Sequence, residues 1–164
     1  MKRIFMMLVA VLFCAGCGGG NKDQAQNAPQ SLKKDQDYMA AGIQSLTQKD
    51  IASAIQNFDM AIKTDPTNVE NYLVLGQVYM RLKQYERAID TFSAAVKVAP
   101  NNPEAHYMLA INDFLDGRFD NAEKSAQRST ELFMMNRDEE KTKKSIALLK
   151  SIEEAKKQQE KTTQ

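Results

Sequence analysis

The stretch that decides the fold is residues 72–100, YLVLGQVYMRLKQYERAIDTFSAAVKVAP. Its apolar residues recur three and four positions apart, which is the spacing of one face of a helix. Gly76 and Ala88 are small residues at which two helices can cross closely, and Pro100 stands where the second helix has to end, because proline cannot continue a helix. The stretch therefore predicts two helices packed against each other as a hairpin.

The same pattern repeats along the chain with a period of 34 residues. The motif A-x3-F-x2-A-x4-P covers residues 54–66 and again residues 88–100. A third and less regular copy starts at Pro103 and carries in register His106, Leu109, Ala110, Gly117, Phe119 and Ala122. Self-similarity at such a period is the signature of a stack of equivalent helical units.

This period and these residues resemble the tetratricopeptide repeat, whose unit is a helical hairpin. The resemblance covers residues 35–136, about three-fifths of the chain. It implies an all-α fold, an α-solenoid of three hairpins over residues 35–68, 69–102 and 103–136. Ser45 and Asp113 stand where the middle copy has Tyr79. Atypical outer repeats are usual in such a stack, because one of their faces has no neighbouring repeat.

The recurring small residues have a packing reason. We expect the first helix of each hairpin to be crossed at a small residue, in turn Gly42, Gly76 and Ala110. We expect the second helix to place facing small residues there, in turn Ala54, Ala88 and Ala122. Large aromatic side chains then fill the gaps around these contacts: Tyr38, Tyr72, Phe58 and Phe92.

Residues 137–158 predict one further helix, and residues 159–164 a disordered tail. A narrow apolar stripe formed by Ile146, Leu149 and Ile152 would cover the open end of the stack, since a solenoid needs polar outer caps for solubility. An alternative is that lysines of this helix contact phospholipid or nucleic acid, namely Lys141, Lys143 and Lys144. Acidic neighbours at positions 138–140 weaken that alternative, because they cancel the local field.

The first residues have the pattern of a targeting segment. Lys2 and Arg3 precede an apolar run of ten residues over positions 4–13, which is shorter than the roughly 20 residues that span a bilayer. Ala15-Gly16-Cys17 then resembles the lipobox of bacterial lipoproteins, although Cys14 stands where a leucine-like residue is usual. The resemblance implies that residues 1–16 are a lipoprotein signal peptide, cleaved before Cys17, which then carries lipid such as palmitate.

Residues 17–34 predict a flexible tether, because they are rich in Gly, Asn, Gln and Ala and carry few large apolar side chains. Two alternatives to the lipid anchor stay open. The chain could be secreted with Cys17 as an unpaired thiol, or the apolar run could remain as a membrane helix.

Composition argues against several functional classes. The net charge is +1, and it becomes −1 without Lys2 and Arg3, so no strong field favours nucleic acid. Both cysteines, Cys14 and Cys17, lie in the targeting segment, and the single histidine, His106, occupies an aromatic packing position. We therefore expect no metal, no cofactor and no enzymatic activity.

The resemblance also implies a concave groove lined by the first helix of each hairpin. Most groove positions are apolar here, and of the cationic and amide residues that grip a carboxylate in some family members only Arg81 is present. We expect a helix or extended segment of another protein to bind there. The expected groove residues are Met39, Ile43, Leu46, Thr47, Leu73, Gln77, Met80, Arg81, Tyr107, Ile111, Phe114 and Leu115.

Two further interpretations of these positions stay open. Several of the side chains could simply pack between adjacent first helices, or the groove could be filled by the terminal helix or by a second copy of the chain.

The hypothesis is a membrane-anchored scaffold or assembly factor of the bacterial envelope, on the outer membrane and facing the periplasm. The alternatives are a self-associating structural lipoprotein that forms a homodimer, and a regulator of an envelope cell-wall enzyme.

Overall fold

The computed structural model describes residues 30–162, with side chains over 34–161. Within these residues the regular secondary structure is all helical, with seven α-helices and no strand. They are α1 (Gln30–Thr47), α2 (Ile51–Thr64), α3 (Val69–Arg81), α4 (Tyr85–Val98), α5 (Pro103–Leu115), α6 (Phe119–Met135) and α7 (Glu139–Thr162). The prediction of three helical hairpins followed by a terminal helix is confirmed.

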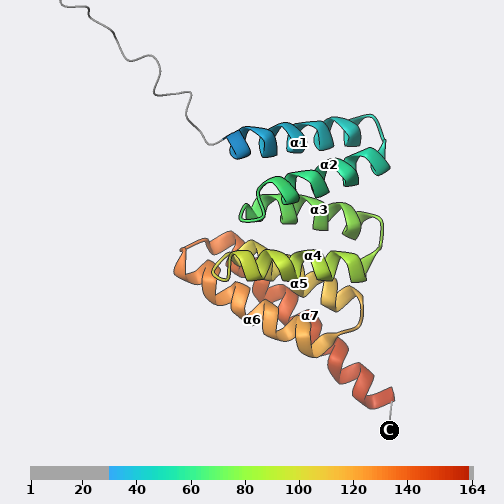
Figure 1. Cartoon of the computed structure of the whole chain (residues 1–164). Coiled ribbons are helices and arrows are strands. Elements are labelled where there is room, and N and C mark those ends of the chain that lie inside the picture. Colours follow the sequence, from blue (N-terminus) through green and yellow to red (C-terminus); the bar gives the residue numbers. More distant parts are fainter. Residues whose placement is uncertain (1–29, 163–164) are drawn as a thin grey trace, which may run out of the picture.

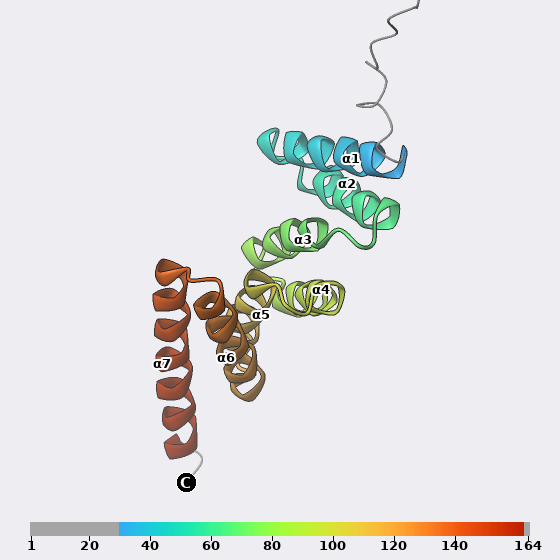
Figure 2. The same cartoon turned by 90° about the vertical axis from the view of Figure 1, so that its left-hand side faces the viewer.

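The helices form an open stack in which each runs back along its predecessor (Figure 1). From top to bottom the stack turns, so that α1 and α2 lie at the upper right and α6 and α7 at the lower left of Figure 2. This is the shape of a short superhelix, in which each hairpin touches only its neighbours.

A glycine meeting a phenylalanine ring sets the spacing inside each of the first two hairpins. A Cβ atom added at Gly76 would lie 2.6 Å from Cε1 of Phe92, and Gly42 meets Phe58 in the same way. Both rings are completely buried. The nearest side chain to each glycine is thus the phenylalanine, not the alanine that we expected from the sequence.

In the third hairpin, two small residues occupy the place where the helices cross. Ala110 stands at the glycine position and Ala126 at the phenylalanine position, and both are completely buried. The two positions therefore change together, glycine with phenylalanine and alanine with alanine, so that the crossing stays filled.

The turn inside each hairpin repeats its backbone conformation at the same 34-residue interval. Lys49, Lys83 and Gly117 have φ angles of 62°, 58° and 78°, the left-handed conformation that often ends a helix. The amide of Lys83 donates to Met80 O, and that of Gln84 donates to Tyr79 O. These are the two hydrogen bonds of a Schellman motif, and they fix how α4 leaves α3.

A buried polar cluster joins the first hairpin to the second. The Asp35 carboxylate is 1% exposed and accepts hydrogen bonds from Asn68 Nδ2 at 2.9 Å and Asn71 Nδ2 at 2.7 Å. Asn68 also caps α3 through the Glu70 amide. The cluster therefore holds the N-terminal end of α1 beside the N-terminal end of α3.

The terminal helix α7 packs through two of the three stripe residues expected, Leu149 and Ile152, and not through Ile146. Ile146 is 39% exposed, whereas Ser145 and Ile152 are completely buried. The Ser145 hydroxyl lies 2.6 Å from Ser129 Oγ and accepts a hydrogen bond from Thr130 Oγ1 at 2.7 Å. The prediction of Ile146 as a packing residue was wrong, because this small hydroxyl cluster, with no apolar signature, lets α7 approach α6 closely.

The helix boundaries at both ends of the stack also differ from the prediction. α1 begins at Gln30, so residues 30–34, expected in the tether, are helical. α7 ends at Thr162, so residues 159–162, expected in a disordered tail, are helical as well. Lys156 stabilises this last part of α7, since its ammonium lies 2.6 Å from Asp120 Oδ1 and 3.1 Å from Glu123 Oε2.

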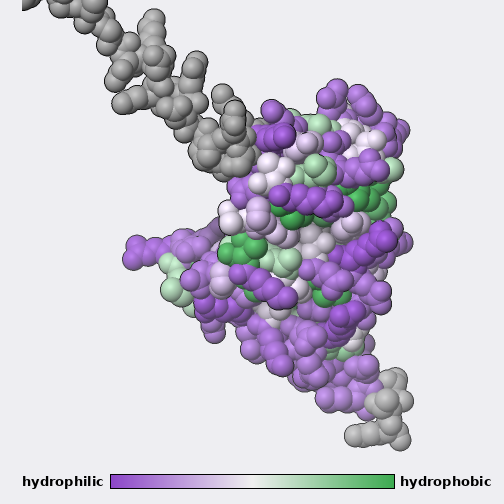
Figure 3. Space-filling model, viewed as in Figure 1, coloured by the Kyte–Doolittle hydropathy of each residue, from purple (hydrophilic) through white to green (hydrophobic). Residues whose placement is uncertain are grey.

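Every helix between residues 30 and 162 is too short or too polar to cross a bilayer. The predicted signal peptide, the lipid on Cys17 and most of the predicted tether lie outside the described residues. The face in Figure 3 is mostly hydrophilic, with hydrophobic residues in small separate groups.

Asp113 is buried at the position where the middle repeat has Tyr79. It is 3% exposed and makes no side-chain hydrogen bond to a described residue. Burial raises the pKa of Asp113 to about 6, and the charge of Arg118 offsets only part of this effect. The folded chain therefore holds a proton on Asp113 at pH values where the unfolded chain has lost it.

We expect Gly76→Ala to lower the free energy of unfolding by about 1–3 kcal/mol, because the added methyl group would strike the Phe92 ring. Alanine otherwise stabilises a helix interior relative to glycine by up to about 1 kcal/mol, so the sign of the change is diagnostic. Urea denaturation followed by circular dichroism measures it. In the double variant Gly76→Ala with Phe92→Leu, the unfolding free energy should fall by less than the sum of the losses in the two single variants.

The packing face of α7 can be tested with two matched variants. Ile152→Ala should cost about 2–4 kcal/mol of unfolding free energy, because it empties a completely buried site. Ile146→Ala should change it by no more than about 0.5 kcal/mol, since that side chain is 39% exposed. Thermal denaturation of both variants measures this difference, and equal losses would contradict the packing described here.

Asp113 should make stability fall as pH rises. Its pKa is raised in the folded state, so the unfolding free energy should drop between about pH 4 and pH 6, by up to about 3 kcal/mol, and stay lower above that range. Asp113→Asn should remove this drop and be more stable than the original chain at pH 7. The difference between the two chains across the pH range isolates Asp113 from the other carboxylates.

Candidate partner-binding site

Several of the expected groove residues lie in the core or pack against it. Leu73 is 5% exposed and packs with Ala88 and Phe92, so its assignment to the groove was wrong. Met80 packs against the same core cluster. Phe114 contacts Phe119, with ring centroids 5.8 Å apart, and packs in the core cluster that contains Ile152 of α7. These side chains are held by neighbouring helices of the chain itself.

The other expected groove residues remain accessible to different degrees. Ile43 is 51% exposed, Leu115 is 48% exposed, and Thr47 and Arg81 are exposed too. The rest are half-buried, namely Met39, Leu46, Gln77, Tyr107 and Ile111. Of these, Met39 and Leu46 also pack against the core cluster that contains Phe58 and Val78. The structure therefore divides the expected groove into covered and open positions.

Three of these positions, Leu46, Gln77 and Arg81, line a pocket of about 240 Å³, which we call the junction pocket. It lies between the C-terminal end of α1, the start of α2 and the C-terminal half of α3. Its walls are mainly aliphatic, and polar groups enter only from two residues of α3. The lining residues are Leu46, Ile51, Val74, Gln77, Val78, Arg81 and Leu82.

Helix spacing explains why these side chains meet. Val74, Gln77, Val78 and Arg81 lie three and four residues apart, so they share the face of α3 that lies toward the first hairpin. Val78 is buried against the first hairpin, while Leu82 at the end of α3 is 38% exposed. The pocket thus has a closed aliphatic floor and an open rim.

The polar groups of the junction pocket are unoccupied. Among residues 34–161, no hydrogen bond or ion pair reaches the Gln77 amide or the Arg81 guanidinium. An amide and a guanidinium that have no partner beside an apolar floor can bind a peptide, since the amide donates and accepts and the guanidinium binds carboxylates.

A second hollow of about 300 Å³, the cap pocket, lies between α5, α6 and α7 and contains the expected groove residue Tyr107. Tyr107 meets the Phe133 ring edge to face, with centroids 6.2 Å apart. Lys141 lies 5.5 Å from the Phe133 ring and 3.3 Å from Glu104 Oε2. Its lining residues are Glu104, Tyr107, Met108, Phe133, Lys141 and Lys144.

The cations of the cap pocket are paired within the chain. Lys144 lies 2.7 Å from Glu140, and a hydrogen bond from this lysine lowers the pKa of the Glu140 carboxyl. Together with the Lys141–Glu104 pair, this leaves little free positive charge here. The alternative that Lys141 and Lys144 contact phospholipid or nucleic acid is therefore not favoured.

His106 has a structural partner. Its Nε2 atom lies 2.9 Å from the carbonyl oxygen of Pro100, and the Tyr72 hydroxyl donates to the carbonyl of Pro66 at 3.0 Å. The two contacts occupy equivalent positions one repeat apart, so the His106 ring takes the structural place that Tyr72 has in the preceding repeat. Within residues 34–161, no three His, Cys, Asp or Glu side chains gather as a metal site would require.

Comparison with known proteins places these features in a family context. The family model described as tetratricopeptide repeat matches residues 45–111. No curated protein sequence matches the chain.

Solved structures of the same architecture are numerous and distant in sequence. PcrH in complex with the chaperone binding region of PopD is 20% identical, with a TM-score of 0.67 over 74% of this chain and 92% of that one. The translocator chaperone SycD of Yersinia enterocolitica type III secretion is 18% identical, with a TM-score of 0.67 over 74% and 85%.

A third similar structure is the first tetratricopeptide domain of Spaghetti (RPAP3) bound to the HSP90 peptide SRMEEVD. It is 21% identical, with a TM-score of 0.65 over 75% of this chain and 93% of that one. At these identities the likeness concerns the fold alone. The family match and the three helix pairs together show that the chain is an all-α solenoid built of tetratricopeptide-type repeats.

Proposed function

We propose that the chain is a protein-binding scaffold or assembly factor of the bacterial envelope, which holds an apolar segment of a partner protein at the junction pocket. One observation carries this proposal: an aliphatic pocket open to solvent lies beside an amide and a guanidinium that have no partner among the described residues. Polar groups that orient a ligand over an apolar floor are the usual composition of a binding site.

The comparisons support binding of a peptide segment. Two structures of the same fold contain a segment of another protein, the chaperone binding region of PopD in one and an HSP90 peptide in the other. In this chain the exposed apolar residue Leu82 lines the pocket, and Ile43, which is also exposed, lies about one helical turn before the lining residue Leu46. A partner with one apolar side chain in the pocket and further apolar contacts along the first helices fits this arrangement.

We place the scaffold at a membrane on the basis of the sequence. Ala15-Gly16-Cys17 after the apolar run supports lipid attachment to Cys17, and Gly18 in place of aspartate favours the outer membrane by the usual sorting rule. Lipid chains contribute about 0.8 kcal/mol per buried CH₂ group, so more than one chain is needed for stable anchoring.

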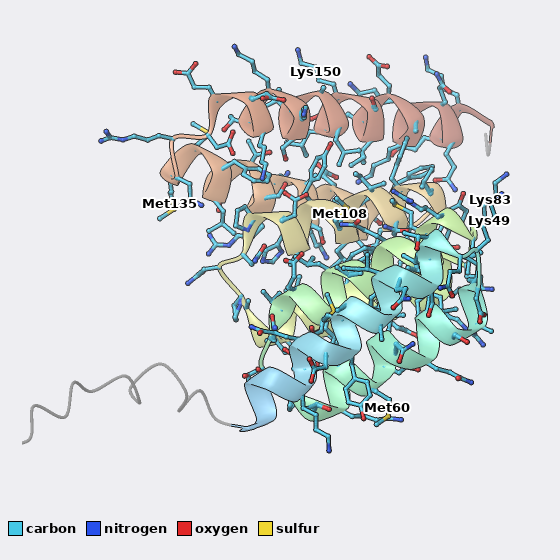
Figure 4. All side chains as sticks on the ribbon, turned by 90° about the horizontal axis from the view of Figure 1, so that it is seen from above. Lys49, Met60, Lys83, Met108, Met135 and Lys150 are labelled. Atoms are coloured by element: carbon cyan, nitrogen blue, oxygen red, sulfur yellow. The ribbon has the colours of Figure 1, made fainter. Side chains whose placement is uncertain are left out.

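Site-specific photocrosslinking in intact cells tests the binding site. A photoreactive phenylalanine at Leu82, on the pocket rim, should form an adduct with a partner protein. The same group at Met60 should not, although both side chains are 38% exposed, because Met60 lies on the side of α2 away from α7 (Figure 4). Equal adducts at both positions, or none at Leu82, would contradict the proposed site, and an adduct with a second copy would replace it by self-association.

The same cells test the anchor. Cys17→Ser should move the chain from the membrane fraction to the soluble fraction and abolish labelling by an alkyne analogue of palmitate. A chain that remains in the membrane without label would show that the apolar segment, and not lipid, holds it there.

A further inference from the structure

A hollow of about 380 Å³, which we call the Asp113 hollow, lies where α4, α5 and α6 meet. Figure 2 shows α5 between α4 and α6, and it packs against both. Asp113 lines this hollow although the residue is only 3% exposed. Further polar lining residues come from the flanking helices, Asp90 and Ser93 from α4 and Asn121 and Ser125 from α6. The hollow shares no lining residue with the junction pocket, so it is a separate feature of the surface.

In the preceding repeat, side chains of the chain itself fill the equivalent place. Tyr79 stands 34 residues before Asp113 and packs against both core clusters of the first two hairpins. Arg87 stands 34 residues before Asn121, and its guanidinium carbon lies 5.7 Å from the centroid of the Tyr79 ring. The third repeat has a shorter side chain at both positions. It therefore lacks the ring and the guanidinium that the middle repeat brings to this junction.

The two carboxylates of the Asp113 hollow have no cationic partner in the part of the chain that the structure describes. Among residues 34–161, no hydrogen bond or ion pair reaches the carboxylate of Asp113 or of Asp90. Of the two cations that line the hollow, Arg118 is held by Asp116, with Nε 2.7 Å from Oδ2, and Lys124 is exposed. Because a buried carboxylate without a partner is unfavourable, the pKa of Asp113 is raised to about 6.

This burial makes Asp113 unfavourable for folding at neutral pH, and no contact within residues 34–161 compensates for it. Side chains that break the rules of stable packing, and carboxyl groups with shifted pKa values in a hollow, are both features of functional sites. At such a site the ligand provides the group that pairs with the carboxylate.

The lining of the Asp113 hollow indicates the chemistry of that group. Carboxylate, hydroxyl and amide oxygens of Asp90, Asp113, Ser93, Ser125 and Asn121 can all accept hydrogen bonds. A guanidinium carries its N–H donors in a planar fork that matches a carboxylate, and it is more weakly hydrated than an ammonium. It therefore suits a hollow that is lined by acceptors and partly removed from water.

We propose that the Asp113 hollow is a second partner-binding site, which receives the guanidinium group of an arginine side chain from another protein. The guanidinium pairs with the buried carboxylate of Asp113 and the exposed carboxylate of Asp90. It fills the part of the junction that Arg87 fills in the preceding repeat. The site goes beyond the proposed function, because it binds a cationic group at a different junction of the stack from the apolar site.

Nuclear magnetic resonance of the full, isotope-labelled chain in detergent micelles tests the site. Titration with N-acetyl-arginine amide should shift the amide signals of Ser93, Asp113 and Ser125 in a saturable manner. The corresponding citrulline derivative has nearly the same shape without the charge. It should bind at least about tenfold more weakly, because the charged pair is lost.

Matched variants assign the effect to Asp113. Asp113→Asn should weaken binding of the arginine derivative at least about tenfold. Asp37→Asn, which makes the same change in net charge at an exposed position of α1, should leave binding unchanged. The double variant Asp113→Tyr with Asn121→Arg restores the two residues of the preceding repeat and should abolish binding. Circular dichroism checks that each variant is folded.

Competition with a proton gives a readout that a purely structural Asp113 would not change. The guanidinium binds the ionised carboxylate, and the pKa of Asp113 is raised to about 6. The affinity of the original chain should therefore rise about tenfold between pH 5 and pH 7. In Asp113→Asn this rise should be absent.

Several results would overturn the proposal. Equal binding of the arginine and citrulline derivatives would show that the charge is not recognised, and equal binding by Asp113→Asn would show that this carboxylate is not the partner. Binding that appears only in Arg118→Gln would show that Arg118 itself pairs with Asp113 and closes the site. Tighter binding of free L-arginine than of the blocked derivative would assign the hollow to a small solute and not to a protein segment.

Discussion

The close approach of a helix backbone to a phenylalanine ring underlies the rest of the structure. Gly42 and Gly76 leave no side chain at the crossing, and the buried rings of Phe58 and Phe92 occupy that space. Each hairpin is thereby a filled unit with a fixed distance between its helices, because a packed interior tolerates neither a void nor an overlap. In the third hairpin Ala110 and Ala126 stand at these two positions, and both are completely buried.

Because each hairpin is tightly packed inside, a surface pocket can form where two hairpins meet. α1 and α3 are held at their N-terminal ends, where Asp35 accepts hydrogen bonds from Asn68 and Asn71. At their C-terminal ends no such clamp exists among the described residues, and the junction pocket lies there. At the other end of the stack, α7 covers the third hairpin through a buried hydroxyl cluster and ion pairs. The proposed binding site and the capping helix are thus at opposite ends of the solenoid.

The sequence predicted the repeats and the terminal helix, together with the packing of Leu149 and Ile152, but it missed part of the contact between α7 and α6. Repeats are read from small and aromatic residues at fixed intervals, and these residue types have few structural alternatives at a close crossing. The face of α7 was inferred from apolar spacing alone, which correctly indicated Leu149 and Ile152 but also favoured Ile146. The structure uses Ser145, whose burial depends on the hydroxyls of Ser129 and Thr130 in another helix. A serine that packs by hydrogen bonding gives no apolar signal in a sequence.

By itself, the sequence determined the all-α stack of hairpins. The contacts that define each hairpin join residues of a single 34-residue repeat, and the same residue types return in the next repeat. Only the tertiary structure decided which groove positions are open. Leu73 and Gln77 lie one turn apart on the same helix, yet Leu73 is covered by α4 and α5 while Gln77 borders the pocket. Exposure depends on side chains that neighbouring hairpins bring in, and helical spacing within one hairpin carries no information about them.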